Sequence, residues 1–249
     1  MTMPKRPNLK PEREGSGAMT LVLIVLVVVA VLGAKYYGVI PGKTPVASQQ
    51  QATAEAARVL LYSAHPTENY APGVAHAKGM GDVVALLGVL QEELRVQGAD
   101  AVVVEPALEA PWDQSFAAAR RMVQPHLSED AAIAAVLDLH RDALEGRPDG
   151  YTTVMIGQTP VAKILFVVGD VDNPYIEQNL AFAEALRTEL ETLAPGICRG
   201  VKVLHNQING DLHPRAVQVF IGDYNGNTLA EAKAATGYLA QALVRVLRR

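Results

Sequence analysis

Hydrophobic and polar positions alternate in blocks along the chain, and from residue 57 onward they predict an α/β fold. Short, continuously apolar runs have the length of strands buried on both faces, whereas longer stretches carry apolar residues at helical spacing. The predicted strands span residues 59–61, 101–104, 133–139, 152–156, 163–168 and 216–221. The predicted helices span 82–96, 112–127, 173–194 and 228–247. This order is typical of a mostly parallel central sheet flanked by helices, with one or two irregular strands.

Local signals set several element boundaries. Asp113 is expected to be the N-cap of the second helix, and Asn173 followed by Pro174 marks the start of the third. The residues from Gly157 to Pro160 supply turn chemistry between the fourth and fifth strands. We therefore expect those two strands to form a hairpin or an edge pair.

A long apolar segment precedes the predicted domain. Residues 18–40 are long enough to cross a bilayer, and the basic tail at 1–17 places the N-terminus in the cytoplasm by the positive-inside rule. Residues 41–56 are rich in small and polar residues and read as a flexible tether. We expect a single-pass cell-membrane anchor with an extracytoplasmic domain at 57–249. The alternative is a cleaved signal peptide, for which the apolar run is long.

Charge and cysteine content exclude two classes of protein. The formal net charge is −4, so the basic face that a nucleic-acid binder needs is not expected. Cys198 is the only cysteine, which rules out an intramolecular disulfide and a zinc site built from several cysteines. A metal site in this chain must therefore use histidine and carboxylate ligands.

A histidine and a glutamate follow the first predicted strand. Pro66 ends the strand, and His65 and Glu68 lie on either side of this break. Ligands bind at the carboxyl ends of strands in open α/β sheets, and imidazole and carboxylate are ordinary zinc ligands. The alternative is that His65 and Glu68 only cap a loop, because loops commonly carry polar residues.

A second histidine, His140, ends the strand at 133–139 in the same manner. If the two strands are neighbours, both imidazoles point into one crevice beside Glu68. Three protein ligands with an open fourth position are what a catalytic zinc ion needs. Asp138 and Asp142 are then available as acceptors that fix the imidazole tautomers.

These residues lie in segments that resemble a known family. Residues 62–70 (YSAHPTENY) resemble the His-Thr-His-Thr-x-Glu-Ser-Tyr segment of the stage II sporulation protein P family, and 137–142 (LDLHRD) resemble its Asp-x-His-Arg-Asp segment. Further matches follow in the same order at 166–169, 173–174, 179–180, 195–197, 206–207, 222, 227–228 and 231–232. The resemblance runs from Arg58 to the C-terminus.

The resemblance implies a function in the cell wall. The family is similar to zinc-dependent N-acetylmuramoyl-L-alanine amidases, which implies a phosphorylase/hydrolase-like three-layer sandwich. It also implies peptidoglycan as substrate, engulfment during sporulation as the setting, and a glycan-cleaving sporulation protein and a membrane scaffold protein as partners. Carried over residue by residue, His65, Glu68 and His140 match the metal ligands. Arg141 is a candidate for binding a substrate anion, and an ion pair with Asp142 is the alternative.

One position departs from the family pattern. The family carries a glutamate two residues before the glycine of its last strand, where a general base would lie, and this chain has Phe220. Asp223 is the nearest substitute in sequence, and Asp211 and Glu177 are further candidates. Gln218 could orient a water but cannot accept its proton. A peptidoglycan-binding or scaffold protein of the same fold is therefore the second hypothesis.

The only tryptophan in the chain is Trp112. It is expected to be either a core residue or a contact to the edge of a sugar, and the sequence does not separate the two.

Overall fold

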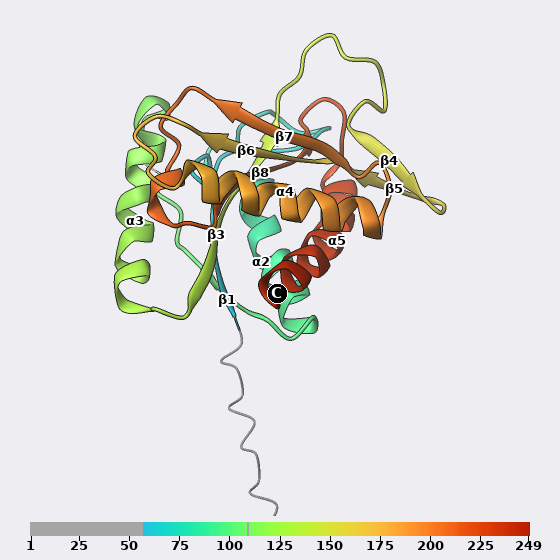
Figure 1. The fold of residues 1–249 in the computed structure, drawn as a ribbon. Helices are drawn as coiled ribbons and strands as arrows, with labels where there is room; N and C mark the ends of the chain where they lie inside the picture. Colours follow the sequence, from blue (N-terminus) through green and yellow to red (C-terminus); the bar gives the residue numbers. More distant parts are fainter. Residues whose placement is uncertain (1–56, 109) are drawn as a thin grey trace, which may run out of the picture. The chain divides into compact units, whose positions relative to one another are not determined.

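A six-stranded sheet forms the centre of the computed structural model, which describes residues 57–108 and 110–249 (Figure 1). The strand order is β2-β1-β3-β8-β6-β7. The strands β2, β1, β3 and β8 are mutually parallel, β6 is antiparallel to β8, and β7 is parallel to β6. The bounds are β1 Arg58–Tyr62, β2 Asp100–Val103, β3 Ile133–Asp142, β6 Ile164–Gly169, β7 Cys198–Leu204 and β8 Ala216–Asp223. The predicted mostly parallel sheet is confirmed.

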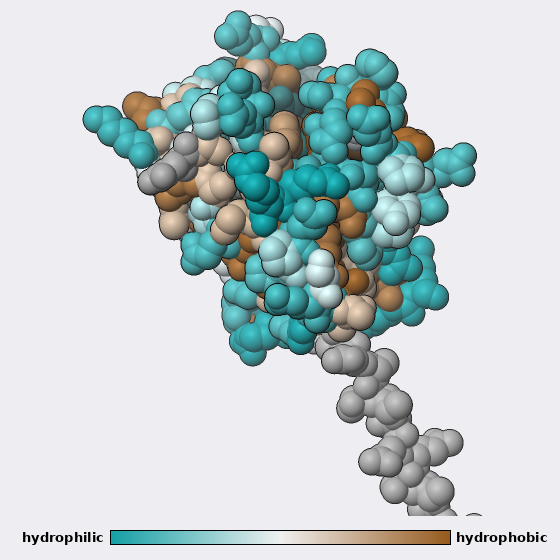
Figure 2. All heavy atoms as spheres, turned by 90° about the vertical axis from the view of Figure 1, so that its left-hand side faces the viewer, coloured by the Kyte–Doolittle hydropathy of each residue, from teal (hydrophilic) through white to brown (hydrophobic). Residues whose placement is uncertain are grey.

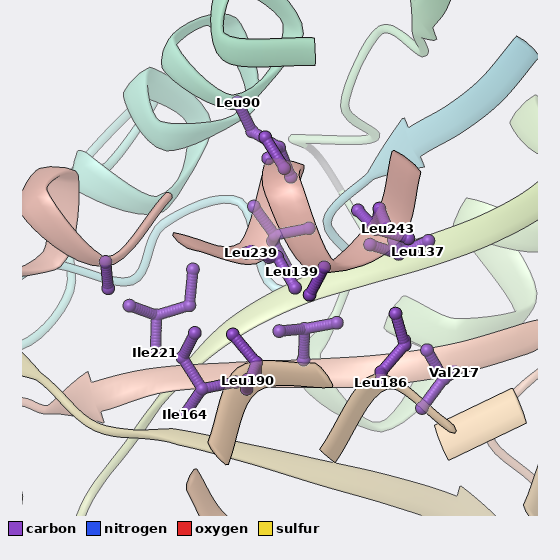
Figure 3. Close-up of a cluster of buried hydrophobic side chains, with 14 of the residues drawn as sticks. Leu90, Leu137, Leu139, Ile164, Leu186, Leu190, Val217, Ile221, Leu239 and Leu243 are labelled. Atoms are coloured by element: carbon purple, nitrogen blue, oxygen red, sulfur yellow. The ribbon is translucent and has the colours of Figure 1, made fainter. Parts of the chain in front are cut away.

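Helices cover both faces of this sheet. The helices α2 (Asp82–Val96), α4 (Ile176–Leu193) and α5 (Leu229–Leu247) lie on one face, and α3 (Ser115–Glu129) lies on the other (Figure 1). The larger core lies between the sheet and the three helices, and leucines dominate it (Figure 3). The face that α3 presents is largely hydrophilic, with hydrophobic side chains between the polar ones (Figure 2).

The alternation of side chains along β3 divides the two cores. Leu137 and Leu139 point into the larger core, whereas Val136 points toward α3. Because successive residues of a strand face opposite sides, Asp138 and His140 lie on the α3 side with Val136. The strand therefore presents Asp138 and His140 on the same face, near its carboxyl end.

The starts of α2 and α5 agree with the sequence, and those of α3 and α4 differ. Thr228 caps α5, and Glu231 completes a capping box. Asp113 is not the N-cap of α3, because it lies inside a 3₁₀ turn at Trp112–Gln114 that precedes the helix. Asn173 bonds the backbone N–H of Tyr175, so it caps a turn before α4 instead of the helix itself.

The predicted pairing of residues 152–156 with 163–168 is wrong. The hairpin is formed by β4 (Thr153–Ile156) and β5 (Thr159–Ala162), and β6 lies in the central sheet. The chain reverses within two residues because Gly157 adopts a positive φ of 62°. The return strand therefore starts at Thr159, where the sequence analysis placed turn residues.

The edge strand β7 was not predicted. Its side chains are half-buried or exposed, and Arg199, Gly200 and Lys202 interrupt any apolar pattern. An edge strand pairs on one side only, so its pattern of hydrophobic residues is weak.

The predicted N-terminal tail, membrane anchor and tether lie at 1–17, 18–40 and 41–56, outside the described residues. Within the part of the chain that the structure describes, no helix is both long and apolar enough to cross a bilayer.

The core predicts the effect of a single truncation. Leu137 is fully buried in the central sheet, so Leu137→Ala is expected to lower the free energy of unfolding by about 2–5 kcal/mol. Val203 on β7 is 47% exposed, and Val203→Ala is expected to change it by less than about 0.5 kcal/mol. Chemical unfolding followed by circular dichroism measures both. Equal losses in the two variants would contradict this description of the core.

Candidate metal centre

The carboxyl ends of β1 and β3 bring the two predicted histidines together. These strands are parallel neighbours, with Tyr62 paired to Asp138. His140 lies two residues beyond Asp138 on the same face, and His65 lies three residues beyond Tyr62. The condition that the sequence analysis set, namely that the two strands be adjacent, is met.

His65, Glu68 and His140 form one cluster. One ligand atom from each lies within 4.8 Å of the others. His65 Nδ1 is 3.7 Å from Glu68 Oε1, and His140 Nδ1 is 3.5 Å from Glu68 Oε2. Glu68 and His140 are buried, at 3% and 1% exposure. Two imidazole nitrogens and a carboxylate are a donor set that zinc uses.

Asp138 fixes the orientation of His140. Its Oδ2 lies 3.0 Å from His140 Nε2, and its Oδ1 accepts a 2.8 Å hydrogen bond from the Ala64 backbone N–H. When His140 is neutral, the contact with Asp138 favours the proton on Nε2, and the lone pair of Nδ1 then faces Glu68. Nδ1 is buried without a hydrogen-bond partner among the described residues. An unpaired buried acceptor beside a carboxylate fits a cation between them.

The pKa values of the two histidines are shifted in opposite directions. Burial lowers the pKa of His65 to about 4, and the nearby His140 adds to this. Burial also lowers the pKa of His140, but the charges and hydrogen bonds of Asp138 and Glu68 outweigh it and raise the value to about 10. The two buried carboxylates therefore create a negative potential at His140, which favours a proton or a metal ion there.

Arg141 holds the loop that carries Glu68. Its backbone N–H donates to Glu68 Oε2 at 3.1 Å, and its guanidinium donates to the carbonyls of Asn69 and Ala75 at 3.0 and 2.8 Å. The Arg141 side chain is buried and its donors are turned toward the loop. The structure thus gives Arg141 a positioning role, and it gives no support to the predicted contact with substrate.

Asp142 does not contact either histidine ligand or Arg141. A register shift in the pairing of β3 with β8 follows His140, and Asp142 bonds Arg199 at 2.8 Å. The predicted ion pair between Arg141 and Asp142 is therefore wrong, and of the two predicted acceptors only Asp138 lies against an imidazole.

Phe220 lies directly beside His140. The two residues are paired in the β3–β8 register, and their rings stack with centroids 5.0 Å apart and planes 20° apart. Gln218, on the same strand face, donates to Asp138 Oδ2 at 3.2 Å. The side of His140 where the family has a carboxylate is therefore occupied by an aromatic ring.

The carboxylates that the sequence analysis named as substitutes have other partners or positions. Asp223 accepts hydrogen bonds from the backbone N–H groups of Leu144, Asn225 and Gly226, which fixes the loop after β8. Asp211 forms a two-point pair with Arg120. Glu177 is exposed in the first turn of α4. These contacts support a structural role for Asp223 and Asp211.

Two aromatic residues at the site were not assigned to it from the sequence. Trp112 stacks on His65 with ring centroids 3.7 Å apart and planes 6° apart, and Phe116 contacts the rings of both His65 and His140. Trp112 lies in the 3₁₀ turn before α3 and Phe116 in the first turn of α3, both far from the histidines in sequence. The single tryptophan of the chain was the one available signal, but its neighbour could not be read from the sequence.

Comparison with solved structures defines the class of fold. The chain is similar to the CwlD amidase from Clostridioides difficile, solved in complex with the GerS lipoprotein, with a TM-score of 0.52 and 12% identity over 77% of this chain and 96% of that chain. It is also similar to a metallo-carboxypeptidase from Burkholderia cenocepacia, with a TM-score of 0.50 and 10% identity over 79% of this chain and 58% of that chain. These likenesses show an amidase-like fold.

The family follows from a separate comparison. Residues 21–244 match the family model of stage II sporulation protein P, and the chain belongs to this family. No curated protein matches the chain.

The close packing of Gly81 against the loop that carries Glu68 predicts the effect of adding a methyl group at position 81. Gly81 has an ordinary φ of −92°, but a Cβ there would lie 2.3 Å from the Glu68 carbonyl oxygen. Gly81→Ala is expected to displace Glu68 and weaken zinc binding by roughly 10- to 100-fold, the range for changes just outside the ligands. Gly79→Ala is the control, because a Cβ there meets nothing within 4 Å. A competitive zinc titration measures both, and equal affinities would contradict the expected displacement.

Proposed function

We propose that this protein is a zinc-dependent N-acetylmuramoyl-L-alanine amidase that remodels peptidoglycan during sporulation. Membership of the stage II sporulation protein P family and the amidase-like fold support the substrate and the setting. The convergence of His65, Glu68 and His140 supports the metal. The observation that carries the proposal is the unpartnered Nδ1 of His140, which faces Glu68 while Asp138 holds Nε2.

In the proposed reaction, water adds to the lactyl carbonyl carbon of muramic acid, and the C–N bond to L-alanine breaks. Zinc at this site would supply a Lewis acid for the carbonyl and lower the pKa of a bound water toward about 7. Asp138 keeps His140 in the tautomer that presents Nδ1. Arg141 keeps Glu68 in place through its backbone N–H and its contacts to the loop.

Proton transfer is the weak step of this proposal. One proton must leave the attacking water and one must reach the leaving amine, and Phe220 can perform neither transfer. Loss of one general base costs roughly 10²–10⁴ in rate, so we infer slow hydrolysis. The stacked contact between Phe220 and His140 also favours a second candidate, a protein that binds zinc and peptidoglycan with little or no cleavage.

We also infer that the described domain works outside the cytoplasm on a membrane anchor at residues 18–40. The sequence supports this through the uncharged apolar run at residues 18–34 and the preceding basic tail. Peptidoglycan lies on that side of the membrane, so the orientation is consistent with the proposed substrate.

Digestion of muropeptides tests the proposed activity. The zinc-loaded, full-length chain is expected to release free stem peptide, to lose this activity with a chelator, and to regain it when zinc is added back. His65→Ala and His140→Ala are each expected to lose both the metal and the product. Chromatography of the products and metal analysis are the measurements. Binding to sacculi without any released peptide would favour the second candidate.

Substitution of Phe220 tests whether proton transfer limits the rate. Phe220→Glu is expected to raise turnover by roughly 10²- to 10⁴-fold, because it restores a carboxylate beside His140. Phe220→Gln is the matched control, because glutamine has nearly the same shape as glutamate but cannot act as a general base. Equal turnover in the two variants would show that another group already moves the proton.

A further inference from the structure

Trp112 presents one face of its indole to solvent beside the proposed metal centre. Its other face is covered by the ring of His65, 3.7 Å away and nearly coplanar. The residue is nevertheless 57% exposed, so the exposed area belongs mainly to the opposite face and the edges. His76 lies at 5.3 Å and almost perpendicular to the indole, which further limits its orientation. An indole with one ring face open to solvent and the other face held by a stacked ring is a preformed stacking surface.

Trp112 is part of the wall of a cleft of about 250 Å³ next to His65. The described lining residues include Thr67, His76 and Leu108, and none of them is Lys, Arg, Asp or Glu. Leu108 is itself 38% exposed. The described lining thus combines an aromatic platform and an aliphatic side chain with hydroxyl and imidazole groups.

We propose that this cleft binds the saccharide part of the substrate, with the free face of Trp112 as the stacking surface for a pyranose ring. This proposal rests on the proposed amidase function. It places the glycan half of the substrate in the cleft formed by the segments that follow β1 and β2. Trp112 is then a specificity-determining residue that places the lactyl carbonyl near His65, Glu68 and His140.

The charges at the site favour a saccharide over the stem peptide in this cleft. A stem peptide carries free carboxylates, and their burial needs a cationic partner. Arg141 is the guanidinium next to the cluster, but it is buried, its Nε and Nη2 donate to loop carbonyls, and its Nη1 lies 3.8 Å from Glu68 Oε1. An N-acetylated pyranose is uncharged and has an apolar C–H face with a polar rim. That chemistry matches an exposed indole bordered by hydroxyl and imidazole side chains.

The chain offers a direct reporter, since Trp112 is its only tryptophan. The full-length His140→Ala variant in detergent is titrated with an uncharged trimer of N-acetylglucosamine, and separately with the free stem peptide. The trimer is expected to change the tryptophan emission in a saturable manner, and the peptide is expected to leave it unchanged. A response to the peptide alone would assign the cleft to the peptide side. No response to either probe would also overturn the proposal.

Variants separate stacking from a general effect on folding. In equilibrium dialysis, Trp112→Ala is expected to raise the Kd for the trimer by roughly tenfold, in line with the loss of one aromatic stack. Trp112→Phe is expected to retain most of the affinity. Met155→Ala is the control, because Met155 is 60% exposed on the β4–β5 hairpin and does not line the cleft. Equal Kd values for Trp112→Ala and Met155→Ala would contradict the proposal.

This test is independent of the proposed hydrolysis. Binding is measured in a variant that is expected to lack the metal, so it does not require turnover. If the wild-type chain cleaves muropeptides but the trimer leaves Trp112 unaffected, the amidase function stands and the saccharide site fails. If the trimer binds and no cleavage occurs, the saccharide site stands and the protein is a wall-binding member of its family.

Discussion

The hydrogen bond between the Asp138 carboxylate and His140 Nε2 is the interaction on which the candidate metal centre depends. A buried carboxylate is costly unless its oxygens are paired, and Asp138 is paired with the backbone N–H of Ala64, the amide of Gln218 and the imidazole. These contacts connect β1, β3 and β8 at one depth of the sheet. They also leave one nitrogen of His140 facing Glu68, which is what a metal ligand requires.

The loop after β1 supplies His65 and Glu68 to the candidate metal centre. Arg141 binds this loop through two of the loop's carbonyl groups. Gly81 has no Cβ, so its backbone packs directly against the carbonyl group of Glu68. The position of Glu68 is therefore set by backbone packing and not by its own side-chain rotamer alone. A carboxylate whose position is already fixed by packing loses less conformational freedom when it binds an ion.

The surroundings of the cluster are aromatic where a hydrolase would have a carboxylate. Phe220 stacks on His140, Phe116 contacts both histidines, and Trp112 covers His65. Such surroundings strengthen the electrostatic interactions between ligands and metal, because they exclude water. They do not move protons. Under the proposed function, the same rings would shield a bound metal from water and would supply no group that accepts a proton.

The sequence by itself determined the alternating elements, the mostly parallel sheet and the strands that end near His65 and His140, because strong hydrophobic runs are local signals. The family followed from the resemblance of its ordered motifs. The sequence did not determine the edge strand β7, whose hydrophobic pattern is weak, or the β4–β5 hairpin, because the return strand begins at Thr159 and Pro160, which are residue types typical of turns. Only the tertiary structure turned Arg141 toward the loop, paired Asp142 with Arg199, and placed Trp112 on His65. Each of these contacts joins residues distant in sequence, and strand register and loop packing decide them.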